Sequence, residues 1–211
     1  MKIKIPRRAV VIITGPSCSG KTCLSERILK AAPAKDKVLH SEDEVMLGII
    51  EREPALRRVV YELSQNGFVG ETVRPCEVPI IDSALERERE KVLKEEHDLI
   101  IIEGLLLDLR QVTTVLRQIC LGQAIQEARR DSLGRSGELV EPVAVVLIKL
   151  SLNPATLFEF CQKRPEIKHQ YGISVLQTMM LSEVIRIDFN SEFITEYLVS
   201  DPRLIELVFE P

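Results

Sequence analysis

One eight-residue stretch constrains the fold of this chain more than any other feature. Residues 15–22 read GPSCSGKT and match the pattern G-x-x-x-x-G-K-[ST], in which backbone N–H groups surround phosphate oxygens. An apolar, β-branched run, AVVIIT at residues 9–14, precedes the stretch, and a segment with apolar residues at helical spacing follows it. Because the pattern functions between a buried strand and a helix, its setting predicts a site for nucleotide phosphates.

The residue types within this loop account for its chemistry. Gly15 and Gly20 allow backbone conformations and close approaches that a Cβ atom would forbid. Lys21 is predicted to be catalytic by reaching the β- and γ-phosphates, and the Thr22 hydroxyl is predicted to bind Mg²⁺. The residues expected to contact the nucleotide form one continuous run: Gly15, Pro16, Ser17, Cys18, Ser19, Gly20, Lys21, Thr22 and Cys23.

The rest of the chain alternates between predicted strands and helices. Short apolar runs that resemble the first strand lie at residues 37–40, 99–102 and 143–150. One more strand is predicted near residues 193–199 or 204–209, and the pattern does not choose between them. The alternation predicts a single α/β domain of residues 1–211 with a mostly parallel sheet flanked by helices.

Composition narrows the function classes. The net charge of −4 and the pI of about 5.6 give no basic excess for binding a nucleic-acid duplex, and aromatic residues make up only 4% of the chain. The five cysteines form no C-x-x-C pair and are interpreted as reduced thiols of a cytoplasmic protein. No membrane contact is expected, because no apolar run is long enough to cross a bilayer. The guanine-reading motif N-K-x-D of GTPases is absent.

An acidic residue ends the predicted strand at residues 99–102. Glu103 is followed by Gly104, and a carboxylate in this position is suited to complete a Mg²⁺ shell or to orient a water molecule. Glu103 is therefore predicted to share the metal with Thr22. The alternative is that Glu103 caps the turn that follows the strand.

A second group of acids follows the predicted strand at residues 37–40. Ser41 is followed by Glu42, Asp43 and Glu44, and one of these carboxylates is suited to accept the proton of an attacking hydroxyl. Asp43 is the first choice as the catalytic base and Glu42 is close behind it, and Glu42 is also predicted to bind the substrate. The alternative is a helix start, because Ser41 and Glu44 fit the capping pattern S-x-x-E. His40 is a weaker candidate beside them.

The helical insert at about residues 44–96 is predicted to bind the phosphate acceptor. Arg74 lies in its turn-rich segment NGFVGETVRPCE and is predicted to bind an acidic acceptor, although a solvated loop arginine is the alternative. The charge run LEREREKVLKEEH at residues 85–97 is interpreted as a solvated helix face. His97 and, after the next strand, Asp108 are interpreted as structural or solvated.

A basic stretch after the fourth predicted strand, FCQKRPEIKHQ, is interpreted as a lid at about residues 160–172. Arg164 is its first catalytic candidate, with Lys163 and Lys168 nearby, because a cationic lid offsets the charge that spreads over a transferring phosphoryl group. The alternative is ordinary surface charge at the end of a helix.

The stretch AVVIITGPSCSGKT resembles the start of P-loop kinases. The layout is similar to the zeta-toxin-like and chloramphenicol-phosphotransferase-like kinases, and to bacterial polynucleotide 5′-hydroxyl kinase domains, which PVAVVLIKLSLNPATLFEFCQKR also resembles. The resemblance covers most of residues 5–170. It implies the three-layer P-loop NTPase fold, ATP and Mg²⁺ as cofactors, a general base at Asp43 or Glu42, and a lid at Arg164.

This chain departs from the polynucleotide kinases at two points. Glu44-Val45-Met46-Leu47 contains no arginine shortly after the acid, and Glu103-Gly104-Leu105 replaces an Asp-Ala-Thr-Asn-like turn. The leading hypothesis is a kinase that phosphorylates a hydroxyl of a small molecule or of a nucleic-acid 5′ end. The rival hypothesis is a nucleotide-binding regulator or NTPase that has no acceptor. The oligomeric state and the identity of the acceptor stay open.

Overall fold

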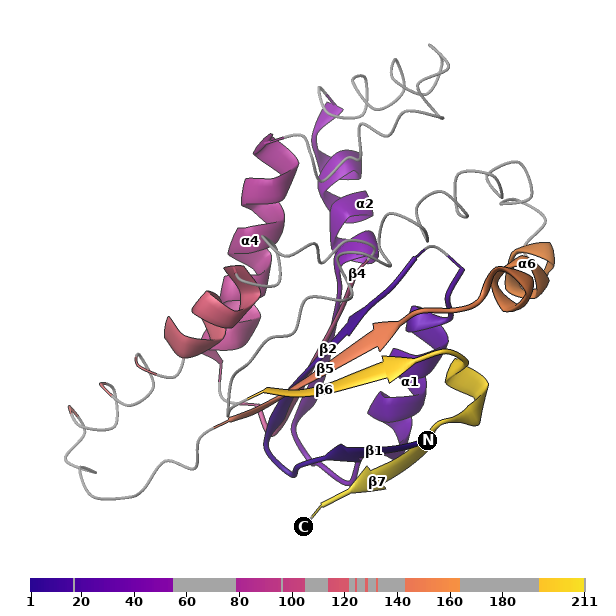
Figure 1. Cartoon of the computed structure of the whole chain (residues 1–211). Coiled ribbons are helices and arrows are strands. Elements are labelled where there is room, and N and C mark those ends of the chain that lie inside the picture. The colour runs from indigo at the N-terminus through magenta and orange to yellow at the C-terminus, as the bar shows by residue number, and fades with distance from the viewer. Residues whose placement is uncertain are drawn as a thin grey trace.

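The structure is a computed structural model of the whole chain. It describes residues 1–16, 18–54, 79–95, 97–104, 114–121, 143–163 and 194–210, together with residues 124, 128 and 132. Within these residues a five-stranded sheet forms the centre of the molecule, and helices pack against both of its faces (Figure 1). The predicted α/β architecture, a parallel sheet flanked by helices, is therefore confirmed.

All five strands of this sheet run parallel, in the order β3–β4–β2–β5–β6. Their bounds are Ala9–Thr14 for β2, Lys37–Ser41 for β3, Leu99–Gly104 for β4, Ala144–Leu150 for β5 and Ile194–Val199 for β6. Ser41 pairs with Glu103, and Thr14 pairs with Gly104. The register therefore brings the carboxyl ends of β3, β4 and β2 to the edge where the glycine-rich loop begins.

Burial on both faces explains why these strands read as unbroken apolar runs. Every residue of β2 and of β4 is buried. Successive side chains of a strand point to opposite faces, so Val11 and Ile13 join one core whereas Val10 and Ile12 join the other.

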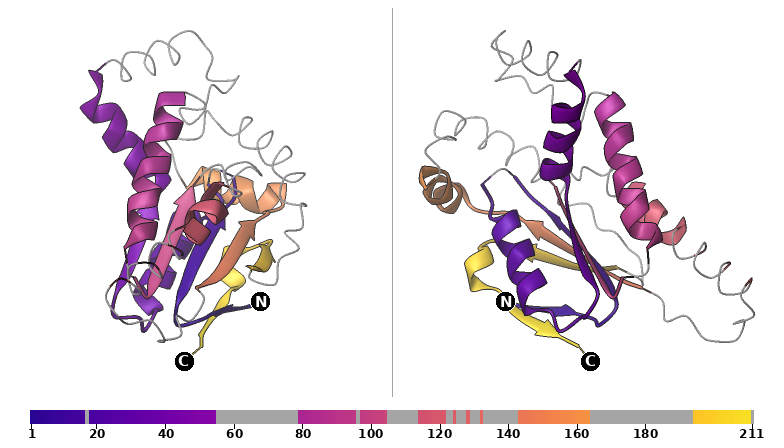
Figure 2. Two further views of the ribbon diagram at one scale, coloured as in Figure 1. Left: turned by 90° about the vertical axis from the view of Figure 1, so that its left-hand side faces the viewer. Right: turned by 180° about the vertical axis from the view of Figure 1, so that it is seen from behind.

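One face of the sheet carries helices and a small ribbon of strands (Figure 2). Its elements are α1 (Lys21–Ala31), α6 (Pro154–Gln162), and the parallel pair β1 (Lys2–Ile5) and β7 (Glu206–Phe209). Ile3 of the ribbon, Ile28 of α1 and Leu157 of α6 share this core. Both predicted positions for the last strand are thus strands, but β6 lies in the central sheet and β7 pairs with β1. The strand β1 had no sequence-based prediction.

The opposite face is covered by the carboxyl half of α4 (Pro79–Lys94) and by helical residues 114–121. Leu93, Val115 and Ile119 pack there. The helix α2 (Glu42–Arg52) packs beside α4, and the two project together past the sheet edge in Figure 1.

The charge run on α4 is not the continuous solvated face predicted for it. Leu85 and Leu93 are buried, as an amphipathic helix requires, but Arg89 is also buried and only 1% exposed. The interpretation of the run as a solvated face is therefore wrong for Arg89. Within the described parts of the chain, no helix is long and apolar enough to cross a membrane.

Candidate functional site

The glycine-rich loop joins the end of β2 to the start of α1. Gly20 is the N-cap of α1 with φ of 88°, and Cys18 also has a positive φ of 62°. A Cβ atom on Gly15 would lie 2.8 Å from Leu150 Cβ, so only glycine fits at that point. The loop therefore turns tightly enough to aim the first N–H groups of α1 at a bound anion. Ser17 lies outside the described residues.

Lys21 folds over this loop. Its Nζ donates hydrogen bonds to the carbonyl oxygens of Gly15, at 3.1 Å, and of Pro16, at 3.0 Å, and the residue is 7% exposed. The loop's own carbonyls therefore hold the ammonium group over the loop. The role of Lys21 in phosphate binding stays a prediction.

Thr22 and Glu103 come from different elements and meet beside the loop. Thr22 Oγ1 donates a hydrogen bond to Glu103 Oε1 at 3.2 Å. Burial raises the pKa of Glu103, and the nearby Ser41 and Thr22 hydroxyls and the charge of Lys21 only partly oppose that rise. The charge of Asp43 raises this pKa further. The structure thus brings together Lys21, Thr22 and Glu103, with Asp43 near enough to act on Glu103.

Three polar atoms around the loop are buried without a hydrogen-bond partner among the described residues: Thr14 Oγ1, Ser19 Oγ and Glu103 Oε2. Buried polar atoms in folded proteins nearly always have a partner, so such a cluster favours a polar ligand. Hydroxyl and carboxylate oxygens are the ligands that Mg²⁺ prefers, and loop N–H groups with a lysine suit phosphates. The residues present therefore fit a magnesium nucleotide.

The two acids that begin α2 have different environments. Glu42 is buried and forms an ion pair with Arg89 of α4, whereas Asp43 is exposed. Ser41 is the N-cap of α2, but its side chain forms no capping hydrogen bond and lies near enough to Glu103 to lower its pKa. The helix start predicted as the alternative is therefore present, without the serine capping contact.

His40 lies on the sheet face that α4 covers and is only 4% exposed. Burial, reinforced by the charge of Arg89, lowers the pKa of His40 to about 4. His40 is therefore neutral at pH 7. His97 lies at the opposite end of the sheet, where it contacts Asp36 at 2.9 Å and Glu95 at 3.1 Å, in agreement with a structural role.

A cavity of about 430 Å³ borders the glycine-rich loop at Cys18 and Gly20. The residues that line it come from the loop, α1, α6 and the segment before β7: Cys18, Gly20, Cys23, Leu24, Arg27, Phe160, Lys163, Pro202 and Arg203. Its position next to Gly20 and its apolar wall suit the nucleoside part of a nucleotide whose phosphates occupy the loop.

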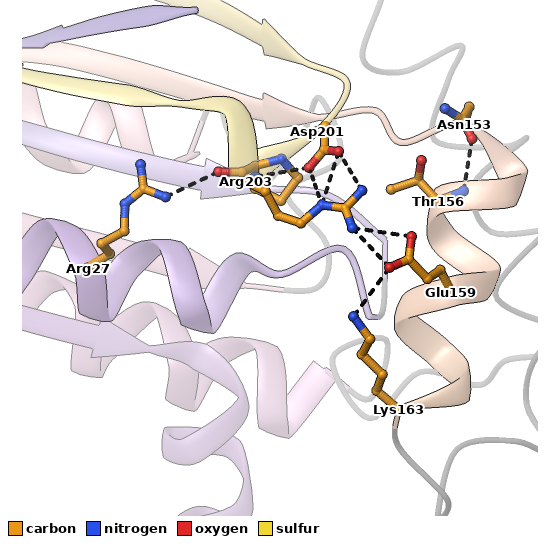
Figure 3. A network of polar contacts seen from close by, with 8 residues as sticks. Arg27, Asn153, Thr156, Glu159, Lys163, Asp201 and Arg203 are labelled. Atoms are coloured by element: carbon orange, nitrogen blue, oxygen red, sulfur yellow. Dashed lines mark hydrogen bonds and ion pairs between the residues drawn. The ribbon is translucent and has the colours of Figure 1, made fainter.

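Arg203 forms one wall of this cavity, and Figure 3 shows its polar contacts. Its guanidinium donates to Asp201 and to Glu159, with Nη1 at 2.9 Å from Glu159 Oε1, and lies 5.0 Å from the centre of the Phe160 ring. Arg27 of α1 donates to the carbonyl oxygens of Pro202 and Ile205, which fastens α1 to the same segment. Sequence reasoning missed Phe160 and Arg203, because they carry no local motif and meet only in the fold.

Two predicted site residues, Arg74 and Arg164, lie outside the described residues, as do Lys168 and Asp108. Lys163, the residue before Arg164, lines the cavity, forms an ion pair with Glu159 at 3.3 Å, and lies 5.7 Å from the centre of the Phe160 ring. The roles of Arg74 and Arg164 stay predictions.

Comparison with known proteins shows the fold. No family model and no curated protein matches the chain. The tunicamycin resistance protein of Deinococcus radiodurans is similar in structure, with a TM-score of 0.52, 14% identity, and coverage of 95% of this chain and 89% of that one. A gluconokinase from Sinorhizobium meliloti 1021 has a TM-score of 0.53 at 11% identity, with coverage of 94% and 86%. The chain thus has the fold of P-loop kinases, as predicted.

Proposed function

We propose that this protein is an ATP- and Mg²⁺-dependent phosphotransferase whose acceptor is a hydroxyl group. The observation that carries the proposal is the convergence of Lys21, Thr22 and Glu103 on a loop lined with buried polar atoms that have no partner among the described residues. Phosphoryl transfer needs positioning and charge stabilisation more than covalent catalysis, and this group of residues supplies both.

Each residue has a defined part in that reaction. The N–H groups of the loop and the amino end of α1 hold the phosphates, and the Lys21 ammonium offsets the charge on the transferring group. Thr22 and Glu103 would hold Mg²⁺, which supplies further neutralisation of the phosphate oxygens when bound. The cavity beside Phe160 and Arg203 would take the nucleoside.

Asp43 is the proposed general base. It is exposed at the start of α2, near enough to Glu103 to raise its pKa. As the acceptor oxygen attacks the γ-phosphorus, the hydroxyl proton passes to the Asp43 carboxylate and the bond to the leaving nucleoside diphosphate breaks. The acceptor is a small molecule or a nucleic-acid 5′ end, bound by the insert at about residues 44–96.

The test uses radiolabelled ATP, Mg²⁺ and a panel of nucleosides, sugars and 5′-hydroxyl oligonucleotides. We expect Lys21→Ala to lower transfer at least about 100-fold, the loss typical of removing one donor to a developing charge. Asp43→Asn should lower transfer by about 10²-fold or more with an unchanged KM for ATP. Glu44→Gln, the matched change at the next exposed acid of α2, should leave transfer unchanged.

Two outcomes would overturn parts of the proposal. An Asp43→Asn variant that transfers phosphate like the wild type would remove Asp43 as the base. A wild-type protein that binds the nucleotide with Mg²⁺ but neither transfers phosphate nor hydrolyses ATP over hours would favour a nucleotide-binding regulator instead.

A further inference from the structure

A buried ion pair lies one residue away from the proposed base. Arg89 Nη1 of α4 donates a hydrogen bond to Oε1 of Glu42, the first residue of α2. The Arg89 residue is 1% exposed and the Glu42 residue 7% exposed, so both charges are removed from water. This pair joins the first residue of α2 to the middle of α4.

Arg89 itself is fixed by a third element. Its Nε donates to Gln118 Oε1 at 3.4 Å, and Gln118 Nε2 donates back to the Glu86 carbonyl oxygen at 3.0 Å. The guanidinium therefore spans α4, the helical residues 114–121 and the start of α2. A planar guanidinium held at two of its nitrogens has one orientation, and it imposes that orientation on Glu42.

The space around Glu42 is equally restricted. A Cβ atom on Gly104 would lie 2.5 Å from Glu42 Oε2, so the glycine at the end of β4 leaves the room that this carboxylate occupies. The Glu42 side chain is thus enclosed between the end of β4 and Arg89. Farther along the two helices, α2 and α4 touch through apolar side chains such as Ile49 and Leu85, and apolar packing of this kind imposes no direction.

Stability alone does not explain a pair of this kind. Two buried charges lose their hydration, and replacing such a pair by apolar residues of similar volume is often neutral or stabilising. The directional hydrogen bonds do what apolar packing cannot, because they set the rotation of α2 about its own axis. Consecutive helical residues point about 100° apart, so the rotation that turns Glu42 toward Arg89 also sets the direction of Asp43.

We infer that Arg89 is a positioning residue that acts through Glu42 to aim Asp43 at the acceptor hydroxyl. The inference rests on the proposed role of Asp43 as the general base. It makes Glu42 part of the support of the site, with its carboxylate committed to Arg89, and it assigns a function to one member of the charge run on α4.

The experiment compares the wild type with Arg89→Met and with the double variant Glu42→Leu/Arg89→Met. Arg89→Met leaves the Glu42 charge buried without its partner, so its melting temperature should fall. The double variant removes both charges and should recover most of the loss. If Arg89 positions Asp43, phosphate transfer by the double variant stays at least about tenfold below the wild type, while the KM for ATP stays within about twofold.

A second measurement needs no acceptor. Amide hydrogen exchange at residues 45–48, whose N–H groups form the first backbone hydrogen bonds of α2, should be at least about tenfold faster in the double variant, with α1 unchanged. A double variant with wild-type transfer and wild-type exchange at residues 45–48 would overturn the inference. Equally faster exchange in α1 and α2 would also overturn it, because the pair would then support the whole fold.

The two proposals fail in different ways. A wild-type protein without transfer or ATP hydrolysis would overturn the proposed function, and exchange at residues 45–48 would still decide whether Arg89 orders the start of α2. Conversely, transfer that depends on Lys21 and Asp43 but not on Arg89 would leave the proposed function intact and remove the inference.

Discussion

Two buried carboxylates, Glu42 and Glu103, lie at the carboxyl ends of neighbouring strands and have opposite environments. The residues are 7% and 3% exposed, and Ser41 pairs in register with Glu103, so Glu42 follows one position beyond. Glu42 is neutralised by Arg89. Glu103 accepts a hydrogen bond from the Thr22 hydroxyl on one oxygen, and its other oxygen has no partner among the described residues.

The difference shows that the charge of Glu42 is balanced without a ligand, whereas that of Glu103 is not. A carboxylate with a buried counter-charge has little to gain from a metal ion, whereas Glu103 remains under the desolvation that raises its pKa. A divalent cation would supply the missing positive charge and bring that pKa down. Burial alone therefore does not identify a binding carboxylate, and the partner of each oxygen does.

The largest expected effect comes from replacing Glu42, the carboxylate paired with Arg89, by glutamine. Glu42→Gln removes the counter-charge of Arg89 while keeping the shape of the side chain, and it should lower the free energy of unfolding by about 3 kcal/mol or more. Urea unfolding at pH 7 measures this. Glu44→Gln on the exposed side of α2 is the control, with a change of about 0.5 kcal/mol at most. A loss no larger than the control's would mean that Glu42 does not depend on Arg89.

Glu103→Gln should affect metal binding and not lower stability. It removes a buried negative charge that has no cationic partner bonded to it, so the unfolding free energy should stay level or rise. The apparent affinity for Mg²⁺ should fall about 10–100-fold, the range seen when the support of a metal site is altered. Titration of Mg²⁺ against bound fluorescent nucleotide measures the loss. An unchanged Mg²⁺ dependence would place the metal elsewhere.

Local pattern explains why one side of the site was predictable. The motif from Gly15 to Thr22 specifies the loop within eight residues, and an acid after an apolar strand is visible as Ile102-Glu103. Arg89 has no such signal, because its partner is 47 residues away and its neighbours Glu88 and Glu90 make the segment look solvated. The Phe160–Arg203 wall escaped prediction for the same reason, since its two residues meet only through the fold.

The fold shows the same difference between features that depend on local sequence and features that depend on contacts between distant residues. Strands such as β2 and β4 were predictable because burial on both faces leaves an unbroken apolar run. The pairing of β1 with β7 was not, because it joins the two ends of the sequence and depends on a core shared with α1. A periodicity test sees neighbours within one element and carries no information about such contacts.

A third prediction uses His40, which lies beside the Glu42–Arg89 pair. The unfolded chain takes up a proton on this histidine below about pH 6.5, but the folded protein resists it until about pH 4. Stability from this group is therefore lost as the pH falls from 6.5 toward 4, by about 2 kcal/mol between pH 7 and pH 5. Urea unfolding at both pH values should show this loss, and His40→Gln should remove it.

His97 supplies the control for that prediction because its sign is opposite. Partial burial lowers the pKa of His97, but hydrogen bonds to Asp36 and Glu95 and their charges together outweigh it, so the pKa is raised. Its contribution is fully present below about pH 6.5 and is lost as the pH rises through the folded value. His97→Gln should therefore leave the loss between pH 7 and pH 5 in place. Equal pH profiles for the two variants would contradict both assignments.

The smallest expected effect extends the comparison to exposed carboxylates. Arg203 binds Asp201 and Glu159 at the surface, where water screens the charges, so Arg203→Gln should leave the melting temperature unchanged. Its guanidinium also faces the Phe160 ring on the cavity wall, and losing that wall should weaken nucleotide binding about two- to fivefold. Fluorescent-nucleotide titration measures the change, and Lys2→Gln, which breaks an exposed pair with Glu206 outside the cavity, is the control. If both variants bind nucleotide equally well, the nucleoside does not occupy this cavity. If nucleotide binding is weakened only in Arg203→Gln, this exposed ion pair supports nucleotide binding but not stability. The buried Glu42–Arg89 pair differs, because stability depends on it.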